Sequence, residues 1–568
     1  MLLSNLDLLA TAPGGVARLR ELILTLAVQG KLVPQDPADE PASVLLQKIR
    51  AEKDRLIAAK ALKREKNEPA LTDDELPFEL PDSWSWVALG EVIDIVRGIT
   101  FPADQKTREA APGRIACLRT SNVQLAIEWD DLLFVDRSFM GREDQLIQHH
   151  DIVMSMANSR ELVGKVALIE HVPHAEATFG GFLGVLRPRK IEPRYAMAVL
   201  RTPYARSLLI DSSSQTTNIA NVSLAKLRPL PFPLPPEAEQ SRIVTRVEEL
   251  MRLCDALEAK GQLGAAQHTQ LVSTLLGTLT ASATPDELAE NWQRVAQHFD
   301  LLLDRPEAID ALEQTLLQLA VRGLLVPQDP TDEPASALLQ KIRAEKDRLI
   351  ATGQIKRDKP LPPITDEEKP FELPVGWEWV RLESLASQIT DGAHHTPTYL
   401  PEGVPFLSVK DLSSGFIDFS DTRFISDQEH RELAKRCRPE MGDVLLTKIG
   451  TTGIAVVIDT HRAFSIFVSV ALIKLPTVSV DRDFLALVIN SPFVRQQSED
   501  GTEGVGNKNL VLRKIKAFQI PIPPLTEQSR IVTRVTALRR LCADLRQRLA
   551  DRQSVQARLA EALVQEVA

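Results

Sequence analysis

Short polar segments, rich in side chains that donate and accept hydrogen bonds, occur in two separate stretches of the chain. Amide, hydroxyl and guanidinium groups of this kind can contact the base edges and phosphates of DNA. The candidate contacts are Arg119, Thr120, Asn122, Asn158, Ser159, Arg160, Lys165, Gln215, Thr216, Thr217 and Asn218 in the first stretch, and His394, His395, Thr396, Tyr399, Lys410, Lys448, Thr451, Thr452, Asn507, Lys508 and Asn509 in the second. Residues of these types also keep ordinary loops in solution, so only their grouping favours recognition of DNA.

Motifs for catalysis are missing from the sequence. There is no GxxxxGK[ST] phosphate loop, and GVGNKN, which begins at Gly504, has only the first two glycines of a dinucleotide fingerprint. The Pro-Pro pairs follow Leu or Ile, whereas adenine methyltransferases use Asp or Asn there to hold the target amine. The histidine pairs at 149–150 and 394–395 lack a spaced third ligand. One enzymatic alternative stays open, a metal-dependent nuclease that uses Asp443 and Lys448.

Composition indicates an ordinary soluble protein of several domains. The chain has 568 residues, of which 44% are hydrophobic and 25% charged, and a net charge of −10. That charge argues against a protein that grips nucleic acid over its whole surface, so DNA binding requires segregated charge or a partner that supplies phosphate contacts. We expect a cytoplasmic location and no membrane span, because no long apolar run or signal peptide is present. The 4 cysteines lack CxxC spacing, and we expect Cys254 and Cys542 to be buried free thiols.

A long internal repeat organises the chain. VPQDPADEPASVLLQKIRAEKDRLIA, from Val33, returns almost unchanged from Val326, a shift of 293 residues when Pro34 is aligned with Pro327 (327 − 34). EQSRIVTRV, from Glu239, returns from Glu527 at a shift of 288 (527 − 239). The sequences between the matched blocks differ. The pattern therefore predicts two equivalent frames that carry two divergent inserts.

The frames are predicted to be helical. Ile531, Val535, Leu538, Cys542, Leu545 and Leu549 form an a/d heptad seam, which recurs from Ile243 to Leu257. A closing helix of about 40 residues would be about 60 Å long. Each copy begins with an opening helix, and we expect it to pair with the closing helix of the other copy in an antiparallel coiled coil. Residues 281–298 belong to neither copy and form a connector. The inserts alternate short β-rich runs with turns, which is typical of mixed α/β domains.

These residues carry a family resemblance. LAVQGKLVPQDPADEPASVLLQKIRAEKDRL, the LPDSWSWV and LPVGWEWV segments, GDVLL, and PLPPEAEQSRIV with IPIPPLTEQSRIV resemble the specificity subunit of type I restriction-modification systems, closest to the type IB branch. The implied fold is α+β, with two mixed α/β target-recognition domains separated by long antiparallel coiled-coil helices, an internal duplication with pseudo-twofold symmetry. The expected regions are 1–86 (helical), 87–236 (recognition domain 1), 237–379 (central helical, with the connector), 380–524 (recognition domain 2) and 525–568 (closing helix).

The resemblance also implies a function and partners. Each recognition domain would read one half of a split double-stranded DNA target, and the subunit itself would be non-catalytic. Two methyltransferase subunits would carry S-adenosylmethionine, and two motor-nuclease subunits would carry ATP and Mg, so that no cofactor is expected on this chain. The repeated frames would offer equivalent docking surfaces to the methyltransferases. The residues expected to bind them are Glu239, Arg242, Arg246, Glu527, Arg530 and Arg534. The alternative is a scaffold whose two globular domains bind other proteins and no DNA.

Overall fold

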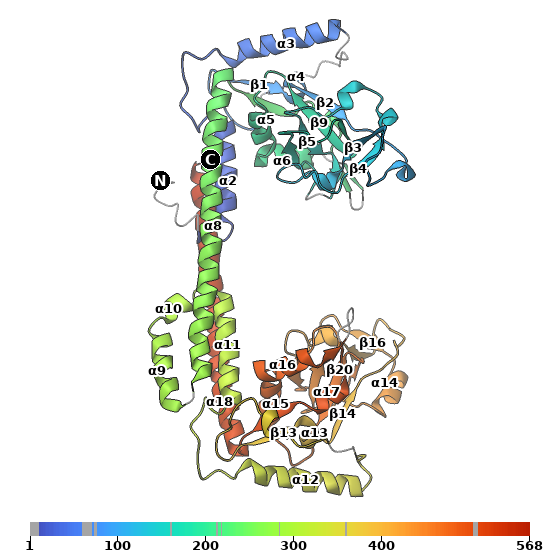
Figure 1. The fold of residues 1–568 in the computed structure, drawn as a ribbon, viewed down its shortest axis with the longest axis vertical. Helices are drawn as coiled ribbons and strands as arrows, with labels where there is room; N and C mark the ends of the chain where they lie inside the picture. Colours follow the sequence, from blue (N-terminus) through green and yellow to red (C-terminus); the bar gives the residue numbers. More distant parts are fainter. Residues whose placement is uncertain are drawn as a thin grey trace. The chain divides into compact units, whose positions relative to one another are not determined.

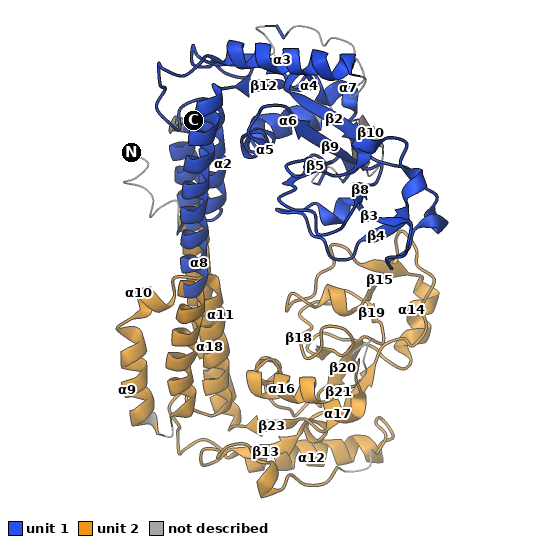
Figure 2. Ribbon diagram, turned by 45° about the horizontal axis from the view of Figure 1, so that its top comes forward, with its two compact units in different colours: residues 1–263, 553–568 blue, residues 264–552 orange. Residues whose placement is uncertain are grey.

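The computed structural model divides into two compact units, residues 1–263 with 553–568, and residues 264–552 (Figure 2). The structure describes residues 11–59, 71–72, 76–159, 162–211, 214–216, 219–282, 284–357, 361–503 and 509–567. No helix in these ranges is long and apolar enough to cross a membrane. All four cysteines are free and buried, as predicted for Cys254 and Cys542.

Unit 1 is built from short strands and peripheral helices. Its strands are β1 (Ser85–Ala88), β2 (Ile93–Arg97), β3 (Arg114–Leu118), β4 (Leu133–Asp136), β5 (Ile152–Ser155), β6 (Ala157–Asn158), β7 (Val166–Leu168), β8 (Ala177–Phe179), β9 (Leu183–Pro188), β10 (Ser214–Thr216), β11 (Ile219–Asn221) and β12 (Pro231–Leu234). Its shorter helices are α2 (Gly15–Val28), α3 (Ala42–Ala58), α4 (Leu89–Val92), α5 (Pro193–Leu200), α6 (Pro203–Asp211) and α7 (Leu224–Leu227). The strands described in this unit form four sheets, β2-β9-β5-β7, β4-β3-β8, β10-β11-β6 and β1-β12. Strands β2, β9 and β5 of the largest sheet can be followed in Figure 1.

Unit 2 repeats this arrangement from a different sequence. Its strands are β13 (Glu378–Arg381), β14 (Gln388–Asp391), β15 (Val404–Leu407), β16 (Arg423–Ile425), β17 (Val444–Thr447), β18 (Ala455–Val457), β19 (Ser465–Ile466), β20 (Val470–Lys474), β21 (Thr502–Glu503), β22 (Asn509–Leu510) and β23 (Gln519–Ile522). Its shorter helices are α9 (Pro285–Ala296), α10 (Phe299–Leu302), α11 (Pro306–Val321), α12 (Ala335–Ala351), α13 (Leu382–Leu385), α14 (Asp427–Ala434), α15 (Arg482–Ile489), α16 (Pro492–Asp500) and α17 (Leu512–Lys516).

The two inserts share the strand order of their two main sheets. The sheet order β14-β20-β17-β18 in unit 2 reproduces β2-β9-β5-β7 in unit 1, and β16-β15-β19 reproduces β4-β3-β8. In β4-β3-β8 and in β16-β15-β19 the central strand pairs with one neighbour antiparallel and with the other in parallel. Strands from both sheets bury runs of Val, Ile and Leu in the unit's core. The divergent inserts are therefore two versions of the same α/β domain.

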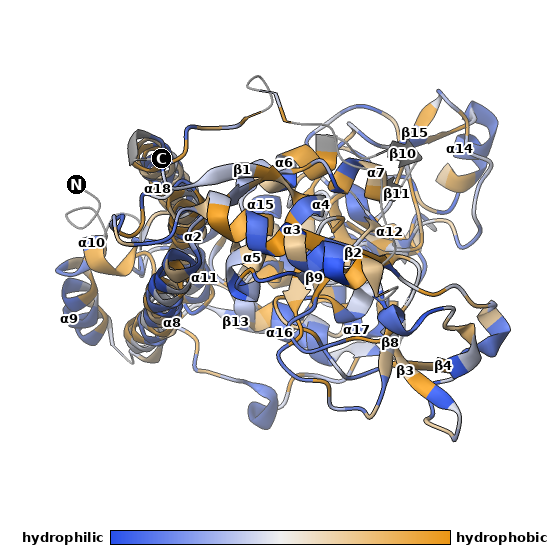
Figure 3. Ribbon diagram, turned by 90° about the horizontal axis from the view of Figure 1, so that it is seen from above, coloured by the Kyte–Doolittle hydropathy of each residue, from blue (hydrophilic) through white to orange (hydrophobic). Residues whose placement is uncertain are grey.

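The frame consists of long amphipathic helices, as predicted. α8 (Glu237–Ala281) has 45 residues and α18 (Leu525–Val567) has 43. Each of them begins in one unit and ends in the other, so the two run antiparallel. Hydrophilic and hydrophobic residues occur along the same frame helices (Figure 3). The predicted seam is confirmed, because Ile531, Val535, Cys542 and Leu549 are all buried in α18.

The opening helices contact both closing helices, which goes beyond the predicted pairing with the closing helix of the other copy. In unit 1, α2 places Arg20 beside Asp255 of α8 and Arg18 beside Glu561 of α18. In unit 2, α11 shares one apolar core with the last turns of α8 and with α18. The predicted connector contains α9, whose Leu288 and Trp292 pack on that core.

Candidate nucleic-acid interface

The polar segments predicted in the first stretch lie together in unit 1. Lys165 Nζ donates to Gln124 Oε1 at 2.9 Å, which joins the turn before β7 to the loop after β3. Asn158 of β6 pairs with Ala220 of β11, which brings the β10–β11 hairpin beside the same turn. Antiparallel pairing and a single long side chain thus gather three segments that are far apart in the sequence.

The corresponding segments of unit 2 also lie together. Ile449 forms a bridge with Asn509, and Leu510 N donates to Lys448 O at 2.8 Å. Ser469 joins this pair to the loop after β15, because its carbonyl accepts from Lys448 N at 2.9 Å and its hydroxyl accepts from Val409 N at 3.1 Å. The structure therefore brings together the groups that the sequence placed apart.

Two of the predicted cations hold equivalent loops closed. Arg119 Nη2 donates to the carbonyl and, at 2.7 Å, to Oδ2 of Asp131. In unit 2, Lys410 Nζ donates to the carbonyl and, at 2.9 Å, to Oδ2 of Asp421. The hydrogen bond from Arg119 lowers the pKa of Asp131, and that from Lys410 lowers the pKa of Asp421. Arg119 keeps 30% of its side chain exposed and Lys410 keeps 47%, so each cation shapes a loop while part of it stays accessible to phosphate.

Several predicted contacts are exposed as a reading surface requires. Ser159 is exposed in unit 1, while Thr120, Asn158 and Lys165 are half-buried. His394, His395, Thr396 and Thr451 are exposed in unit 2, while Thr452 and Asn509 are half-buried. Tyr399 lies under the guanidinium of Arg423 at 4.4 Å from the ring centroid, a stacked pair that offers an aromatic edge and a positive charge.

Two predictions need correction, because the side chains point inward. Asn122 is buried, and its Nδ2 donates to the carbonyls of Glu128 and Asp130, both at 3.0 Å. Lys448 is only 4% exposed, and its Nζ donates to Asp391 Oδ2 at 3.3 Å. Both side chains form hydrogen bonds inside their own domain and are not available to contact DNA. Arg160, Thr217, Asn218, Asn507 and Lys508 lie outside the described residues, as do the side chains of Gln215 and Thr216.

Buried glutamates join each domain to its frame helix. Trp84 Nε1 donates to Glu239 Oε2 at 2.9 Å, and Gln35 Nε2 donates to Glu239 Oε1 at 2.6 Å. Unit 2 has the same arrangement, in which Trp377 and Gln328 donate to Glu527 at 3.1 and 2.7 Å. Burial raises the pKa of both carboxyl groups. We call these two clusters the anchors.

The anchors change the interpretation of the residues expected to bind a partner. Glu239 and Glu527 are buried inside the anchors, so direct contact with a partner is not open to them. Arg242 and Arg530 are engaged within their own units by Asp39 at 2.5 Å and Asp332 at 2.6 Å. Of the six expected residues, Arg246 and Arg534 are exposed. The other four are the same in both copies because each copy uses them for the same contacts inside its own unit.

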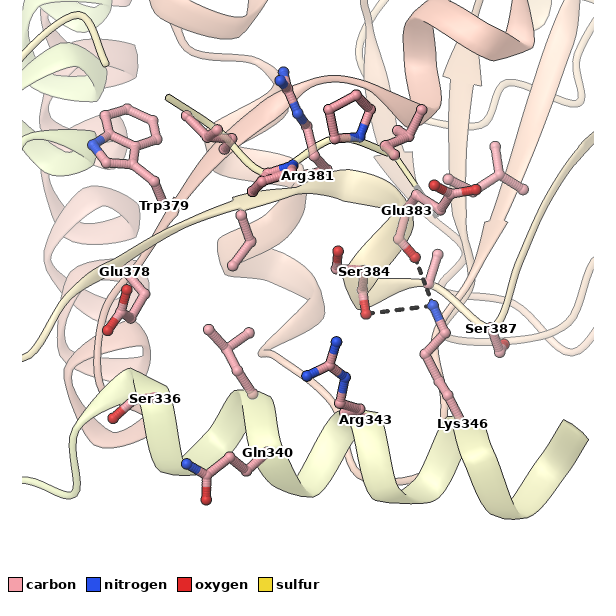
Figure 4. Close-up of a pocket in the computed structure, with 18 of the residues that line it drawn as sticks. Ser336, Gln340, Arg343, Lys346, Glu378, Trp379, Arg381, Glu383, Ser384 and Ser387 are labelled. Atoms are coloured by element: carbon pink, nitrogen blue, oxygen red, sulfur yellow. Dashed lines mark hydrogen bonds between the residues drawn. The ribbon is translucent and has the colours of Figure 1, made fainter. Parts of the chain in front are cut away.

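The repeated charged helix lies across the base of each domain. In unit 2, α12 borders a cavity of about 1530 Å³ together with β13 and α13. Lys346 reaches across it to the carbonyl of Glu383 at 2.6 Å, and Arg343 points toward it, whereas Gln340 points away (Figure 4). The exposed faces of α3 and α12 are nearly identical in sequence. An exposed face that is the same in both copies is a candidate for a contact made twice.

The residues of the nuclease alternative do not form one site. Asp443 bonds Lys474 at 2.7 Å, while Lys448 bonds Asp391. Over the described ranges, no group of three or more His, Cys, Asp or Glu side chains is arranged to hold a metal ion. The geometry defines instead a protein with two similar α/β domains on a repeated helical frame.

Comparison with known proteins agrees with this class. Residues 81–264 and 374–552 match the type I restriction modification DNA specificity domain. The chain is 34% identical to the type I restriction enzyme EcoEI specificity subunit and 36% identical to the EcoAI specificity subunit, both of Escherichia coli, in each case over 97% of this chain and 93% of the relative. A chain solved in work on assembly and conformational transition of the type I R-M system aligns with 86% of this chain and 99% of its own length, with 20% identity and a TM-score of 0.46.

This chain belongs to the family of type I restriction-modification specificity subunits. It is thus a non-catalytic subunit.

Proposed function

We propose that the chain directs adenine methylation and DNA cleavage to a bipartite sequence, with one half read by each recognition domain. The observation that carries this proposal is the pair of loop clusters, which have the same topology and a different set of exposed side chains. A common topology presents loops in the same way, and different side chains then select different bases. An asymmetric split target follows from two such domains in one chain.

We further propose that two methyltransferase subunits bind the repeated frame. Exposed residues on the first turns of α8 recur on α18. Arg246 and Arg252 correspond to Arg534 and Arg540, and Leu253, which is 59% exposed, corresponds to Leu541, which is 58% exposed. A large apolar side chain that is exposed to the same extent in both copies suits a contact made once per copy. The matching faces of α3 and α12 extend the proposed docking surface.

The remaining chemistry belongs to the partners in this proposal. S-adenosylmethionine would bind the methyltransferase subunits, and ATP with Mg would bind two motor-nuclease subunits, with no cofactor on this chain. The complex would act in the cytoplasm, where it meets cellular and invading DNA. The methyltransferases would also supply phosphate contacts from their side of the DNA, which offsets the net charge of −10 on this chain.

Mapping of methylated adenines tests the proposal. DNA from cells that express this chain with its methyltransferase is compared with DNA from cells that express the methyltransferase alone. We expect a new bipartite motif, and we expect exchange of residues 87–236 for those of a relative to change one half of it only. If the complex assembles and no new methylation occurs, the target-reading function is wrong and the alternative of a protein scaffold takes its place.

A further inference from the structure

The loop that follows β3 in unit 1 and the loop that follows β15 in unit 2 share one construction. Each starts with a 3-10 turn, Thr120–Asn122 in unit 1 and Val409–Asp411 in unit 2. The last residue of each turn is buried and accepts a hydrogen bond from the backbone N–H three residues earlier, at 2.9 Å in unit 1 and 2.6 Å in unit 2. The loops differ in sequence, so the shared contacts reflect a shared demand on their shape.

Further contacts fix the far side of both loops. Glu128 N donates to Asn122 O at 2.9 Å, and Asp418 N donates to Asp411 O at 2.9 Å. The ion pairs of Arg119 with Asp131 and of Lys410 with Asp421 then close the base of each loop. Below them, Val123 in unit 1 and Leu412 in unit 2 are buried in the domain core. Each loop is thus held at its base by a buried apolar residue and a cation.

Both loops carry an exposed apolar side chain at their tip. Leu125 is 89% exposed in unit 1, and Phe416 is 58% exposed in unit 2. The tip of unit 1 is held in place, because Arg201 Nη2 donates to Leu125 O at 2.7 Å and Lys165 binds the neighbouring Gln124. The tip of unit 2 turns at Gly415, whose φ of +85° favours glycine.

An exposed Leu or Phe gains nothing from water, and a single one is common on protein surfaces. Here the equivalent loop of each domain places one exposed apolar side chain among polar residues, although the two loops differ in sequence. In unit 1 the cations Lys165 and Arg201 bond Gln124 and Leu125 at the tip, and in unit 2 Arg462 lies over Phe419, three residues after Phe416, at 4.7 Å from the ring centroid. Cations around an apolar tip suit DNA, which presents phosphates beside apolar base surfaces.

We infer that Leu125 and Phe416 are specificity-determining residues that make apolar contacts with bases, each in the half-site read by its own domain. The ion pairs and hydrogen bonds at the base of each loop hold it so that the tip side chain reaches the bases while neighbouring cations meet phosphates. Contact with the C5-methyl group of thymine and insertion between base steps are the two forms that such a contact takes. The inference rests on the proposed DNA-reading function.

Binding of the assembled methyltransferase complex to its duplex tests the inference. We expect Leu125→Ala and Phe416→Ala each to weaken specific binding by about five- to thirtyfold, the loss of one apolar base contact. In a duplex whose first half-site is scrambled, Leu125→Ala should cause no further loss, and Phe416→Ala should behave in the same way with the second half-site. Replacement of thymine by uracil in each half-site distinguishes the two forms of contact. It should weaken binding if the side chain contacts the C5-methyl group, and it should leave binding unchanged if the side chain inserts between base steps.

Val375→Ala is the matched control, because Val375 is an apolar residue that is 99% exposed and belongs to neither loop, in the segment just before Trp377. It should leave binding unchanged. Both tip residues are exposed, so their replacement should also leave thermal stability unchanged. Specific binding by the wild type with no loss in either tip variant overturns the inference and leaves the proposed function standing. Absence of specific binding by the assembled wild-type complex overturns the proposed function itself.

Discussion

Equivalent positions of the two copies have opposite charges, and we expect these charges to determine which opening helix pairs with which closing helix. In unit 1, Arg20 of α2 donates to Asp255 and Glu258 of α8, at 2.6 and 3.1 Å. At the equivalent position of α11 the chain has Glu313, which accepts from Arg546 of α18 at 2.8 Å. The repeat shifts align Arg20 with Glu313 and Glu258 with Arg546, so the two copies use opposite charges. At this position each opening helix therefore has the charge that matches the closing helix of its own copy.

Arg20→Glu removes two ion pairs and places like charges together. Arg20 has 30% of its side chain exposed, and the two acids have 66% and 56% exposed, so solvent screening reduces each term. Exposed pairs of this kind contribute about 0.2–1 kcal/mol each, and the new repulsion is of similar size. We expect Arg20→Glu to reduce the local free energy of opening of α2 by about 1–2 kcal/mol. The loss should shrink in 1 M salt.

The second copy supplies the rescue. Arg20→Glu combined with Asp255→Ala and Glu258→Arg reproduces the charges found at Glu313, Ala543 and Arg546. Hydrogen exchange of Gly15–Val28 measures the effect, with Arg55→Glu on α3 as a control in a pair within one helix. We expect the triple variant to restore protection of α2. Equal protection in Arg20→Glu and wild type, or no recovery in the triple variant, would show that these charges do not select the pairing.

Two further predictions concern single positions in the domains and their anchors. A Cβ on Gly98 would lie 2.2 Å from the carbonyl oxygen of Gly180, and one on Gly392 would lie 1.9 Å from that of Ile466, so Gly98→Ala and Gly392→Ala should each destabilise their own unit by about 1–3 kcal/mol or more, measured by hydrogen exchange in the two units. Glu239→Gln turns an amide toward one of the two anchor donors and should cost about 1–3 kcal/mol. Burial raises the pKa of the Glu239 carboxyl in the folded state, so the folded protein binds this proton more tightly than the unfolded chain does. The wild type therefore gains stability from this group at low pH and loses that gain as pH rises through the folded-state pKa. The difference in Tm between wild type and variant should be larger at pH 4.5 than at pH 8.

The sequence by itself determined the frame. The repeat revealed two copies, and the heptad spacing revealed the buried seam of α18, because helix periodicity is a local property that a sequence displays directly. The β-rich runs of the inserts also indicated mixed α/β domains. The tryptophans and glutamates of the anchors recur in both copies of the sequence, but the sequence did not show that they form hydrogen bonds with each other.

Tertiary structure decided what each polar residue does. Lys448 and Asn122 looked like DNA contacts, yet both are buried, because strand pairing and loop closure set the direction of a side chain. Glu239 and Glu527 looked like partner contacts, yet both accept hydrogen bonds from residues more than 140 positions away. Such contacts depend on non-local packing, which the order of residues alone does not display.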